Sequence, residues 1–463
     1  MMPPDRFFAL SLKLLSRPPI AFGLVAAALF GPLAASASAD DTTDPIGQVI
    51  QGGGAEWSDS YDAASVSAAD VRTSTPILST AIVDAVSNAI TQYSDIVAKG
   101  GWPIVPAEKK LKIGVQDPAV VTLRQRLAIS GDLAAAAAGT SDAFDSYVDA
   151  AVKRFQARHG LQPDGVVADS TFAALNISAA VRLNQLATNL TRLKMLTSRL
   201  PSPRFVVVNI PAATVEAVDN GQVVSRHTAV VGKIDRPSPL VNSKITEINF
   251  HPFWTVPSSI IRRDLIPIMQ KDPGYLDRYH IRIYDPKGNE LTPQQVDWTT
   301  DEATKYMFRQ DPGDENSLGI VKINFASPEG VYMHDTPHKG LFNDEFRFDS
   351  SGCVRIQNIR ELIVWLLRDT QGWNRDQIDA EFKSGERTDV KLATPVPLFW
   401  TYITAWAVTD GVVNFRNDIY GLDGLDQLSG QAAEPDPAAT ATAAAAGPNS
   451  ILDPAPTPGK NGN

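Results

Sequence analysis

The sequence predicts an α+β protein, with a helical N-terminal part followed by a mixed, mostly β domain that carries a helical insertion. Apolar residues recur at helical spacing from residue 76 to 202, and this period of 3.6 is typical of amphipathic helices. From Arg204 the period changes to two, which is typical of half-buried strands. A chain of 463 residues is long enough for two or three domains.

Residues 1–39 have the pattern of a secretory signal. Three basic residues precede the apolar stretch AFGLVAAALFGPL, and the small residues ASASAD follow it. We expect cleavage after Ala39. The apolar stretch has 13 residues, which is short for a membrane span, so no stable membrane insertion is expected after cleavage; an uncleaved anchor is the alternative.

The charge of the chain points away from nucleic acid as a partner. The formal net charge is −10, and removing three cations and one acid with the signal leaves about −12. No basic stripe of the kind that binds nucleic acid is present.

The helical part divides at its glycines and prolines. A first helix is expected to stop at Gly100-Gly101 and Pro103, and two further amphipathic helices flank an alanine-rich stretch. The expected segments are a disordered linker (40–75), a helical region (76–114), a small helical unit (115–176, with helices at 117–132 and 146–160) and a linker helix (177–202).

The β part is expected to span 203–428. Asn220-Gly221 is a strong hairpin signal. Further expectations are an insertion at 258–318 with helix signals near 259–270, strands at 319–326 and 330–335, a helix at 358–369 with Asn358 as its N-cap, and a hairpin at 396–421 turning at Asp410-Gly411. The last segment, 429–463, is rich in Ala, Pro and Gly and should be disordered.

The chain holds one cysteine, Cys353, so no internal disulfide is possible. In an oxidising compartment such a thiol is either buried and inert or chemically active. Gly352 lets the backbone approach a substrate closely, and a turn that leads into a helix leaves free N–H groups for an oxyanion. A strand, a Ser-Gly-Cys turn and a helix would therefore suit acyl transfer, if an imidazole takes the thiol proton.

Residues 115–176 resemble a three-helix peptidoglycan-binding module. The matching stretches are VVTLRQRLAISGD, AVKRFQARHGLQPDG and STFAAL. A plain helical bundle, or a module that has lost its ligand groove, are the alternatives, because the alanine run at 134–138 departs from the usual loop.

Residues from about 203 to 421 resemble the L,D-transpeptidase (YkuD-like) catalytic domain, in its multidomain branch. The resemblance lies in VVNIPA, VVGKIDRPSPLVNSKI, HPFWTVPSSI and HDTP…SSGCVR…N, together with GGWP at 100–103. It implies Cys353 as nucleophile and His334 as general base, with the Asp335 carbonyl orienting the imidazole. It also implies an oxyanion hole from the N–H groups of Gly352 and Cys353, and Arg355 securing the loop or a carboxylate.

The commoner family motif has histidine where this chain has Ser351, which leaves His334 as the matching histidine. His338 is the rival base, and Pro337 argues against a helix that would align both histidines on a metal. Trp254 and Tyr332 are expected to flank the donor peptide; packing of both rings in a β core is the alternative. The insertion is expected to be a lid, or else a plain structural insertion.

The resemblance implies a periplasmic enzyme of cell-wall biogenesis that needs no cofactor and no metal. Its partners would be peptidoglycan stem peptides and glycan. Such enzymes cleave the bond between the third residue of a tetrapeptide stem and D-alanine, and pass the acyl group to another stem as a 3→3 crosslink. An L,D-carboxypeptidase, or a wall-binding scaffold with a silent site, are the alternatives.

Overall fold

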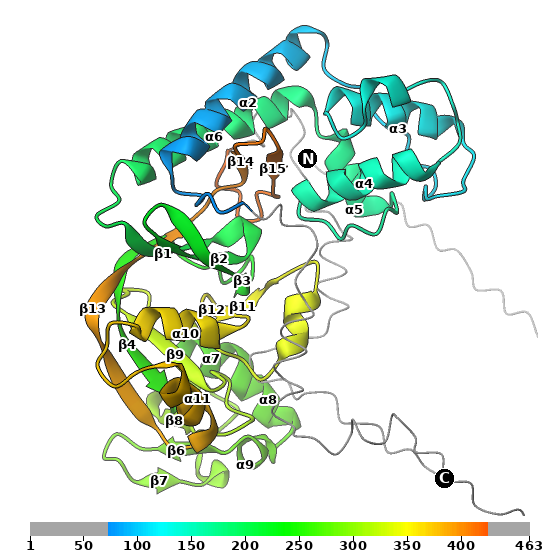
Figure 1. The fold of residues 1–463 in the computed structure, drawn as a ribbon. Helices are drawn as coiled ribbons and strands as arrows, with labels where there is room; N and C mark the ends of the chain where they lie inside the picture. The colour runs from blue at the N-terminus through cyan, green and yellow to red at the C-terminus, as the bar shows by residue number, and fades with distance from the viewer. Residues whose placement is uncertain (1–72, 425–463) are drawn as a thin grey trace, which may run out of the picture. The chain divides into compact units, whose positions relative to one another are not determined.

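A computed structural model describes residues 73–424 of the protein. The expected signal, all but the end of the linker, and the C-terminal tail lie outside the described residues. Figure 1 shows helices gathered in the N-terminal part and strands in the C-terminal part, which confirms the predicted α+β class.

The five helices expected between residues 76 and 202 are all present. Ser79 and Asp117 cap the first two by accepting from the backbone N–H groups of Ile82 and Ala119. The helices are α2 (Thr80–Ala98), α3 (Pro118–Ile129), α4 (Ser146–Arg158), α5 (Asp169–Asn176) and α6 (Ala179–Thr197), and the alanine-rich stretch forms a short 3₁₀ segment, η1 (Ala135–Ala137).

Nine strands within residues 73–424 form the main sheet. Their order is β11-β3-β12-β10-β9-β4-β13-β1-β2, and β2 also pairs with β3, so the sheet closes on itself. The strands are β1 (Arg204–Asn209), β2 (Thr214–Asp219), β3 (Gln222–Gly232), β4 (Val241–Phe250), β9 (Val321–Phe325), β10 (Met333–His334), β11 (Phe348–Ser350), β12 (Val354–Ile356) and β13 (Thr388–Thr401).

The predicted hairpin at Asn220-Gly221 joins β2 to β3, with φ of 50° and 78° at its two residues. The shorter connections are η2 (Ile210–Ala212) and η6 (Lys339–Asn343). Helices α10 (Ile359–Leu367) and α11 (Arg375–Ser384) complete the domain, and α11 had no counterpart among the expected elements.

The insertion folds around its own apolar core of aromatic and aliphatic residues. Its small sheet begins with β5, just before the predicted boundary at 258, and has the order β5-β8-β6-β7. Its elements are β5 (Trp254–Thr255), α7 (Ser258–Ile260), the π-helical η3 (Ile261–Leu265), α8 (Ile266–Lys271), α9 (Tyr275–Arg278), β6 (Ile281–Tyr284), β7 (Glu290–Leu291), η4 (Pro293–Gln295), η5 (Asp301–Lys305) and β8 (Met307–Gln310).

Successive side chains of β1 point alternately into two different apolar cores. Val206 and Val208 join the core that also holds α10 and α11, whereas Phe205 and Val207 join the core of α2 and α6. Each set is spaced by two residues because successive side chains of a strand point to opposite faces.

The C-terminal hairpin is shorter than predicted. Its strands are β14 (Ala405–Ala407) and β15 (Val413–Phe415), which pair around the predicted turn at Asp410-Gly411. Residues 396–401 belong instead to β13, where they pair with β1 and β4. The small helical unit packs on this hairpin, because Arg158 pairs with Asp132 and donates to the Val413 carbonyl at 3.1 Å.

Candidate functional site

Three adjacent strands place a row of polar side chains on one face of the main sheet. Lys322 on β9 is the register partner of His334 on β10, and His334 is the register partner of Arg355 on β12. Register partners on neighbouring strands point to the same face. The residues between them, such as Ile323 and Met333, belong to the apolar core on the other face.

A second row lies on the same face. Tyr332 stands two residues before His334, and Cys353 stands two residues before Arg355. The two-residue period therefore turns Tyr332 and Cys353 to the side of His334. The sequence-predicted residues Cys353, His334, Arg355 and Tyr332 thus come together, although they lie on two separate strands.

The imidazole of His334 is held in one tautomer. His334 is 4% exposed, and its Nδ1 donates to the Asp335 carbonyl oxygen at 2.5 Å. Nε2 is therefore left as an acceptor. Burial lowers the pKa of His334 to about 3, and the Arg355 and Lys322 cations act in the same direction against the hydrogen bond to Asp335. The imidazole is neutral at physiological pH and can accept a proton.

Asp335 is fixed through its side chain. The carboxylate accepts from the Ile320 N–H at 3.0 Å and pairs with Lys339 at 2.5 Å. Gly319 has φ of +59°, and a Cβ there would lie 2.5 Å from the Asp335 carboxylate. Only glycine fits at this close approach, so the backbone that orients His334 depends on Gly319.

Cys353 is a partly exposed residue outside any disulfide. Burial in its surroundings raises the pKa of Cys353 to about 11; the Tyr332 N–H and hydroxyl and the cations of Arg355 and Lys322 oppose this shift. Between residues 73 and 424, no hydrogen bond joins the thiol to His334. The resting site therefore pairs a protonated thiol with a neutral imidazole, and is not a thiolate–imidazolium pair.

Two buried serines hold the backbone around Cys353. The Ser350 hydroxyl donates to the Cys353 carbonyl at 2.5 Å and accepts from the Gly352 N–H at 3.1 Å. The Ser238 hydroxyl donates to the Gly352 carbonyl at 2.9 Å. Gly352 has φ of +108°, a value that favours glycine. The loop is therefore pre-shaped, but the Gly352 N–H is already used.

The predicted order of strand, turn and helix around Cys353 is wrong. The short strand β12 follows Cys353 directly, and α10 begins only at Ile359. Val354 and Ile356 are buried in the core on one face, which favours a strand at this point. The N-cap is Asn358 as predicted, but its side chain makes no capping bond. Free helix N–H groups therefore do not lie at the thiol.

Ser351, which replaces the commoner histidine, connects the cysteine loop to the insertion. Its hydroxyl lies 3.0 Å from Nη1 of Arg236. Arg236 also makes two hydrogen bonds, of 2.6 and 2.8 Å, to Asp264 in η3 of the insertion. A bidentate Arg–carboxylate pair has a fixed geometry, so this contact sets the position of the insertion relative to the loop.

The two aromatic residues have different positions. Trp254 is 2% exposed and packs in the core of the insertion. Core packing is the alternative expected for this ring from the sequence. Its Nε1–H donates to the Tyr332 hydroxyl at 3.0 Å. Tyr332 is partly exposed, and the buried indole holds its phenol in place.

The sequence did not single out Lys322. In VKINF it alternates with apolar residues, like any lysine on the solvent side of a strand. In the structure it is half-buried, and its Nζ lies 4.4 Å from the centre of the Tyr332 ring. Only its register with His334 marks Lys322 as a site residue, and strand pairing cannot be deduced from the sequence alone.

The rival histidine, His338, lies apart from the row of site residues. His338 stands at the start of η6, outside β10 and its row of site residues. In the part of the chain that the structure describes, no cluster of three His, Cys, Asp or Glu side chains could hold a metal.

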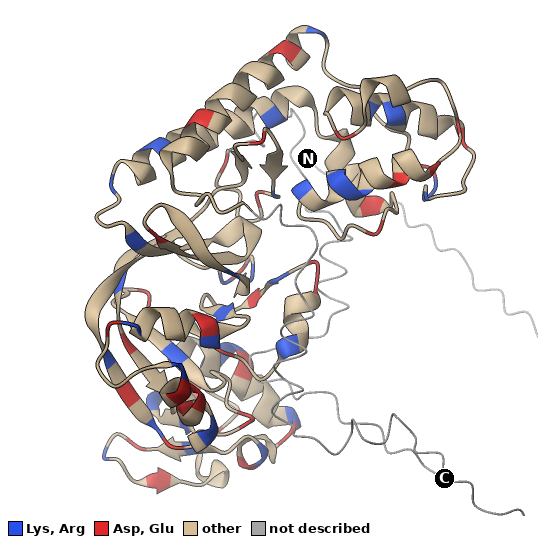
Figure 2. Ribbon diagram, in the orientation of Figure 1, with Lys and Arg blue, Asp and Glu red and all other residues tan. Residues whose placement is uncertain are grey.

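Among the helices of residues 73–424, none has the length and apolar character that a membrane span requires. Basic and acidic residues are interspersed over the described part of the chain (Figure 2).

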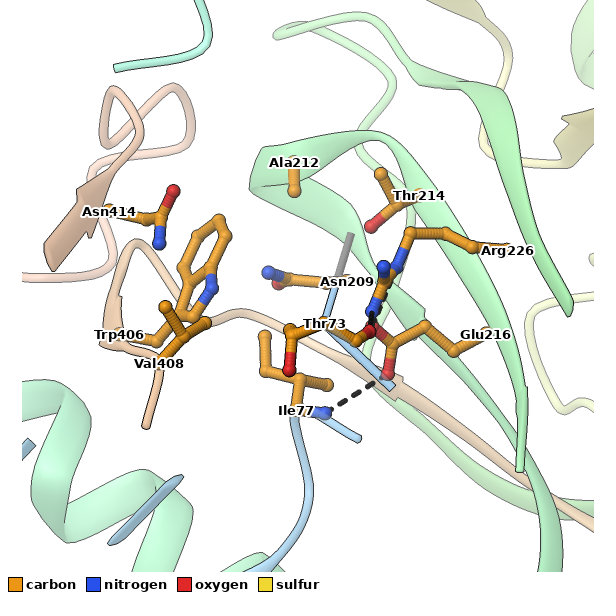
Figure 3. A pocket seen from close by; sticks show the side chains of 10 residues that line it. All are labelled: Thr73, Ile77, Asn209, Ala212, Thr214, Glu216, Arg226, Trp406, Val408 and Asn414. Atoms are coloured by element: carbon orange, nitrogen blue, oxygen red, sulfur yellow. Dashed lines mark hydrogen bonds and ion pairs between the residues drawn. The ribbon is translucent and has the colours of Figure 1, made fainter. Parts of the chain in front are cut away.

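A small pocket of about 30 Å³ lies elsewhere, and none of the predicted site residues lines it. Figure 3 shows Glu216 and Arg226 side by side on one wall of the pocket, with Trp406 and Asn414 on the opposite wall. The Glu216 carboxylate accepts from Arg226 at 2.8 Å and from the Ile77 N–H at 3.0 Å, and Arg226 donates to the Thr73 carbonyl at 3.2 Å. The charged groups satisfy one another, so the pocket anchors residues 73–77 to the sheet.

Comparison with known families agrees with the geometry. Residues 203–397 match the model described as "L,D-transpeptidase catalytic domain" (YkuD). These residues are similar to the L,D-transpeptidase catalytic domains of the YkuD family. Residues 116–175 match the model described as "Putative peptidoglycan binding domain", within one residue of the unit predicted from the sequence.

A relative from Haemophilus influenzae, named "Putative L,D-transpeptidase", is 34% identical over 243 residues. The match covers 52% of this chain and 48% of the relative, so the chain spans about half the length of that protein.

Two solved L,D-transpeptidase structures also resemble the chain at 16% identity. The one from Mycobacterium smegmatis covers 43% of this chain and 58% of its own, with a TM-score of 0.21. The one from Xylanimonas cellulosilytica covers 64% and 99%, with a TM-score of 0.20. Similarity at this level supports no conclusion about the site.

Proposed function

We propose that the protein is an L,D-transpeptidase that forms 3→3 crosslinks between peptidoglycan stems, with Cys353 as nucleophile and His334 as general base. The observation that carries this proposal is the shared sheet face of Cys353 and His334, with Nδ1 of His334 held by the Asp335 carbonyl. The family of residues 203–397 supports the same reaction class.

The neutral dyad suits acylation of the thiol. Nε2 of His334 takes the thiol proton as sulfur attacks the carbonyl carbon between the third stem residue and D-alanine. The tetrahedral intermediate collapses, the C–N bond breaks, and the imidazolium returns the proton to the departing D-alanine amine. The side-chain amine of a second stem then attacks the thioester, transfers its proton to His334 and releases the Cys353 thiol.

The oxyanion site has one donor ready. Among the residues from 73 to 424, no acceptor is bonded to the Cys353 N–H. The Gly352 N–H donates to Ser350 instead, so it can serve as the second donor only when the Ser350 hydroxyl releases it. Arg355 is 3% exposed, and its cation beside the thiol would stabilise negative charge that develops there.

The remaining parts fit an enzyme of the cell wall. Residues 116–175 would hold the enzyme on peptidoglycan, and residues 1–39 would export it to the periplasm. The insertion, fastened to the cysteine loop through Arg236 and Asp264, would act as a lid over the donor peptide.

Mass spectrometry of a reaction with disaccharide-tetrapeptide tests the proposal. The expected product is a dimer that has lost one D-alanine, and Cys353→Ala should form none while keeping its circular dichroism spectrum. Tripeptide without dimer would show an L,D-carboxypeptidase. No product of either kind, or a dimer from Cys353→Ala, would disprove the proposed reaction.

A further inference from the structure

Lys322 is a cation that the protein places beside the nucleophile without an anionic partner of its own. It is half-buried on β9, in register with His334. Its Nζ lies over the face of Tyr332 at 4.4 Å from the ring centre, and both the Lys322 cation and Tyr332 act to lower the pKa of Cys353 against its burial. The ammonium therefore lies on the substrate side of the sheet, close to the thiol.

The two carboxylates whose charge acts on Lys322, Glu247 and Asp389, have hydrogen-bond partners of their own. Glu247 accepts from Asn249 at 2.9 Å, and Asp389 accepts from Asn249 at 2.7 Å and from Arg387 at 2.7 Å. Within the described range 73–424, no carboxylate forms an ion pair or hydrogen bond with Lys322. Taking an ammonium partly out of water is unfavourable unless an anion or acceptor meets it.

Tyr332 offers only part of that compensation. The face of an aromatic ring attracts a cation but does not accept its three N–H hydrogens. The hydroxyl of Tyr332 already accepts the indole N–H of Trp254. The N–H groups of the Lys322 ammonium can therefore donate hydrogen bonds to a molecule that enters the site.

We propose that Lys322 binds a carboxylate of the donor peptide and so selects stems that carry this group next to the scissile bond. The inference rests on the proposed function and adds a binding residue to the same site. Two carboxylates of a tetrapeptide stem have the required chemistry: the C-terminal carboxylate of D-alanine and the side-chain carboxylate of a diamino acid at the third position.

Steady-state kinetics with three donors distinguishes the two sources. The donors are the tetrapeptide, its C-terminal amide, and its third-residue side-chain amide. Lys322→Met removes the charge but keeps an unbranched side chain, and Lys322→Arg keeps the charge. Lys244→Met is the matched control, because Lys244 is an exposed lysine on the neighbouring strand β4.

Lys322→Met should raise KM for the tetrapeptide about 10-fold or more, because a hydrogen bond to a charged group is lost. The same variant should show no loss with the one amide that lacks the bound carboxylate. Lys322→Arg should restore most of the affinity, and Lys244→Met should match the parent. If Lys322→Met impairs all three donors equally, Lys322 acts only on the thiol or on Tyr332, and the inference is wrong.

Calorimetric binding to Cys353→Ala keeps this inference separate from the proposed reaction. Charge-dependent binding of the tetrapeptide without turnover by the parent would reject transpeptidation and retain the carboxylate site. Turnover with carboxylate-independent binding would retain transpeptidation and reject the site. Neither binding nor turnover of any donor would reject both.

Discussion

His334→Ala tests the neutral dyad most directly. With the pKa of Cys353 near 11, about one thiol in 10⁴ is ionised at pH 7. The parent avoids this limit because His334 takes the proton during attack, a contribution that is typically about 10²–10⁴-fold. His334→Ala should lose acylation rate by about that factor at pH 7.

The pH dependence of the variant should then follow the thiolate. Burial raises the pKa of Cys353 to about 11. At pH values below this pKa, each increase of one pH unit should therefore raise the thiolate population and the rate of the variant about tenfold. Between pH 7 and 9 the variant should recover about 100-fold. The parent should change little over the same range, since the pKa of His334, about 3, lies well below it.

The assay is acylation by a chromogenic β-lactam under single-turnover conditions, from pH 6 to 10. His338→Ala is the control and should follow the parent. A pH-independent rate in His334→Ala would show that Cys353 is already a thiolate, and parent-like activity of that variant at pH 7 would exclude His334 as the base. A crippled His338→Ala would move the role to His338.

Four further expectations follow from the same geometry. A carbapenem should add the mass of one drug molecule to the peptide that holds Cys353; an adduct on Ser350 or Ser351 would reassign the nucleophile. The pKa of His334 is lowered to about 3, so the unfolded state binds the extra proton, and the parent should lose more thermal stability than His334→Gln as pH falls from about 6.5 toward 4. Asp264→Asn should leave Arg236 without its bidentate partner and increase hydrogen exchange in residues 258–271; unchanged exchange would mean that this contact does not hold the insertion. Deleting residues 115–176 should weaken binding to isolated sacculi more than it slows turnover of small stems, provided that circular dichroism confirms folding once the surface beneath Arg158 is exposed.

Local signals were sufficient for most elements. The Asn220-Gly221 turn was predicted and joins β2 to β3. The helices that begin at Thr80 and Pro118 follow from the same kind of local signal, since Ser79 and Asp117 cap them. The failures lie where pairing between distant segments decides. Residues 396–401 have the same apolar character in a hairpin as in a central strand, and only β1 and β4 assign them to β13.

In the site, too, a local motif revealed some residues, whereas contacts between distant segments could not be predicted. The motif identified His334 and Cys353, and the Asp335 carbonyl accepts from His334 as the resemblance implied. The motif could not show that Ser350 holds the Gly352 N–H, or that Trp254 supports Tyr332 from inside the insertion. Those contacts come from side-chain packing between segments, which no short pattern of residues specifies.

One strand register accounts for the chemistry of the whole site. Because β10 runs beside both β9 and β12 in register, His334 has a cation on each side, Lys322 and Arg355. Two cations disfavour an imidazolium, so they help to keep His334 neutral until the thiol gives up its proton. The same cations favour the negative charge that then develops on sulfur and oxygen. The arrangement therefore keeps the resting imidazole uncharged and stabilises the negative charge that develops on sulfur and oxygen during the attack, which is where stabilisation accelerates the reaction.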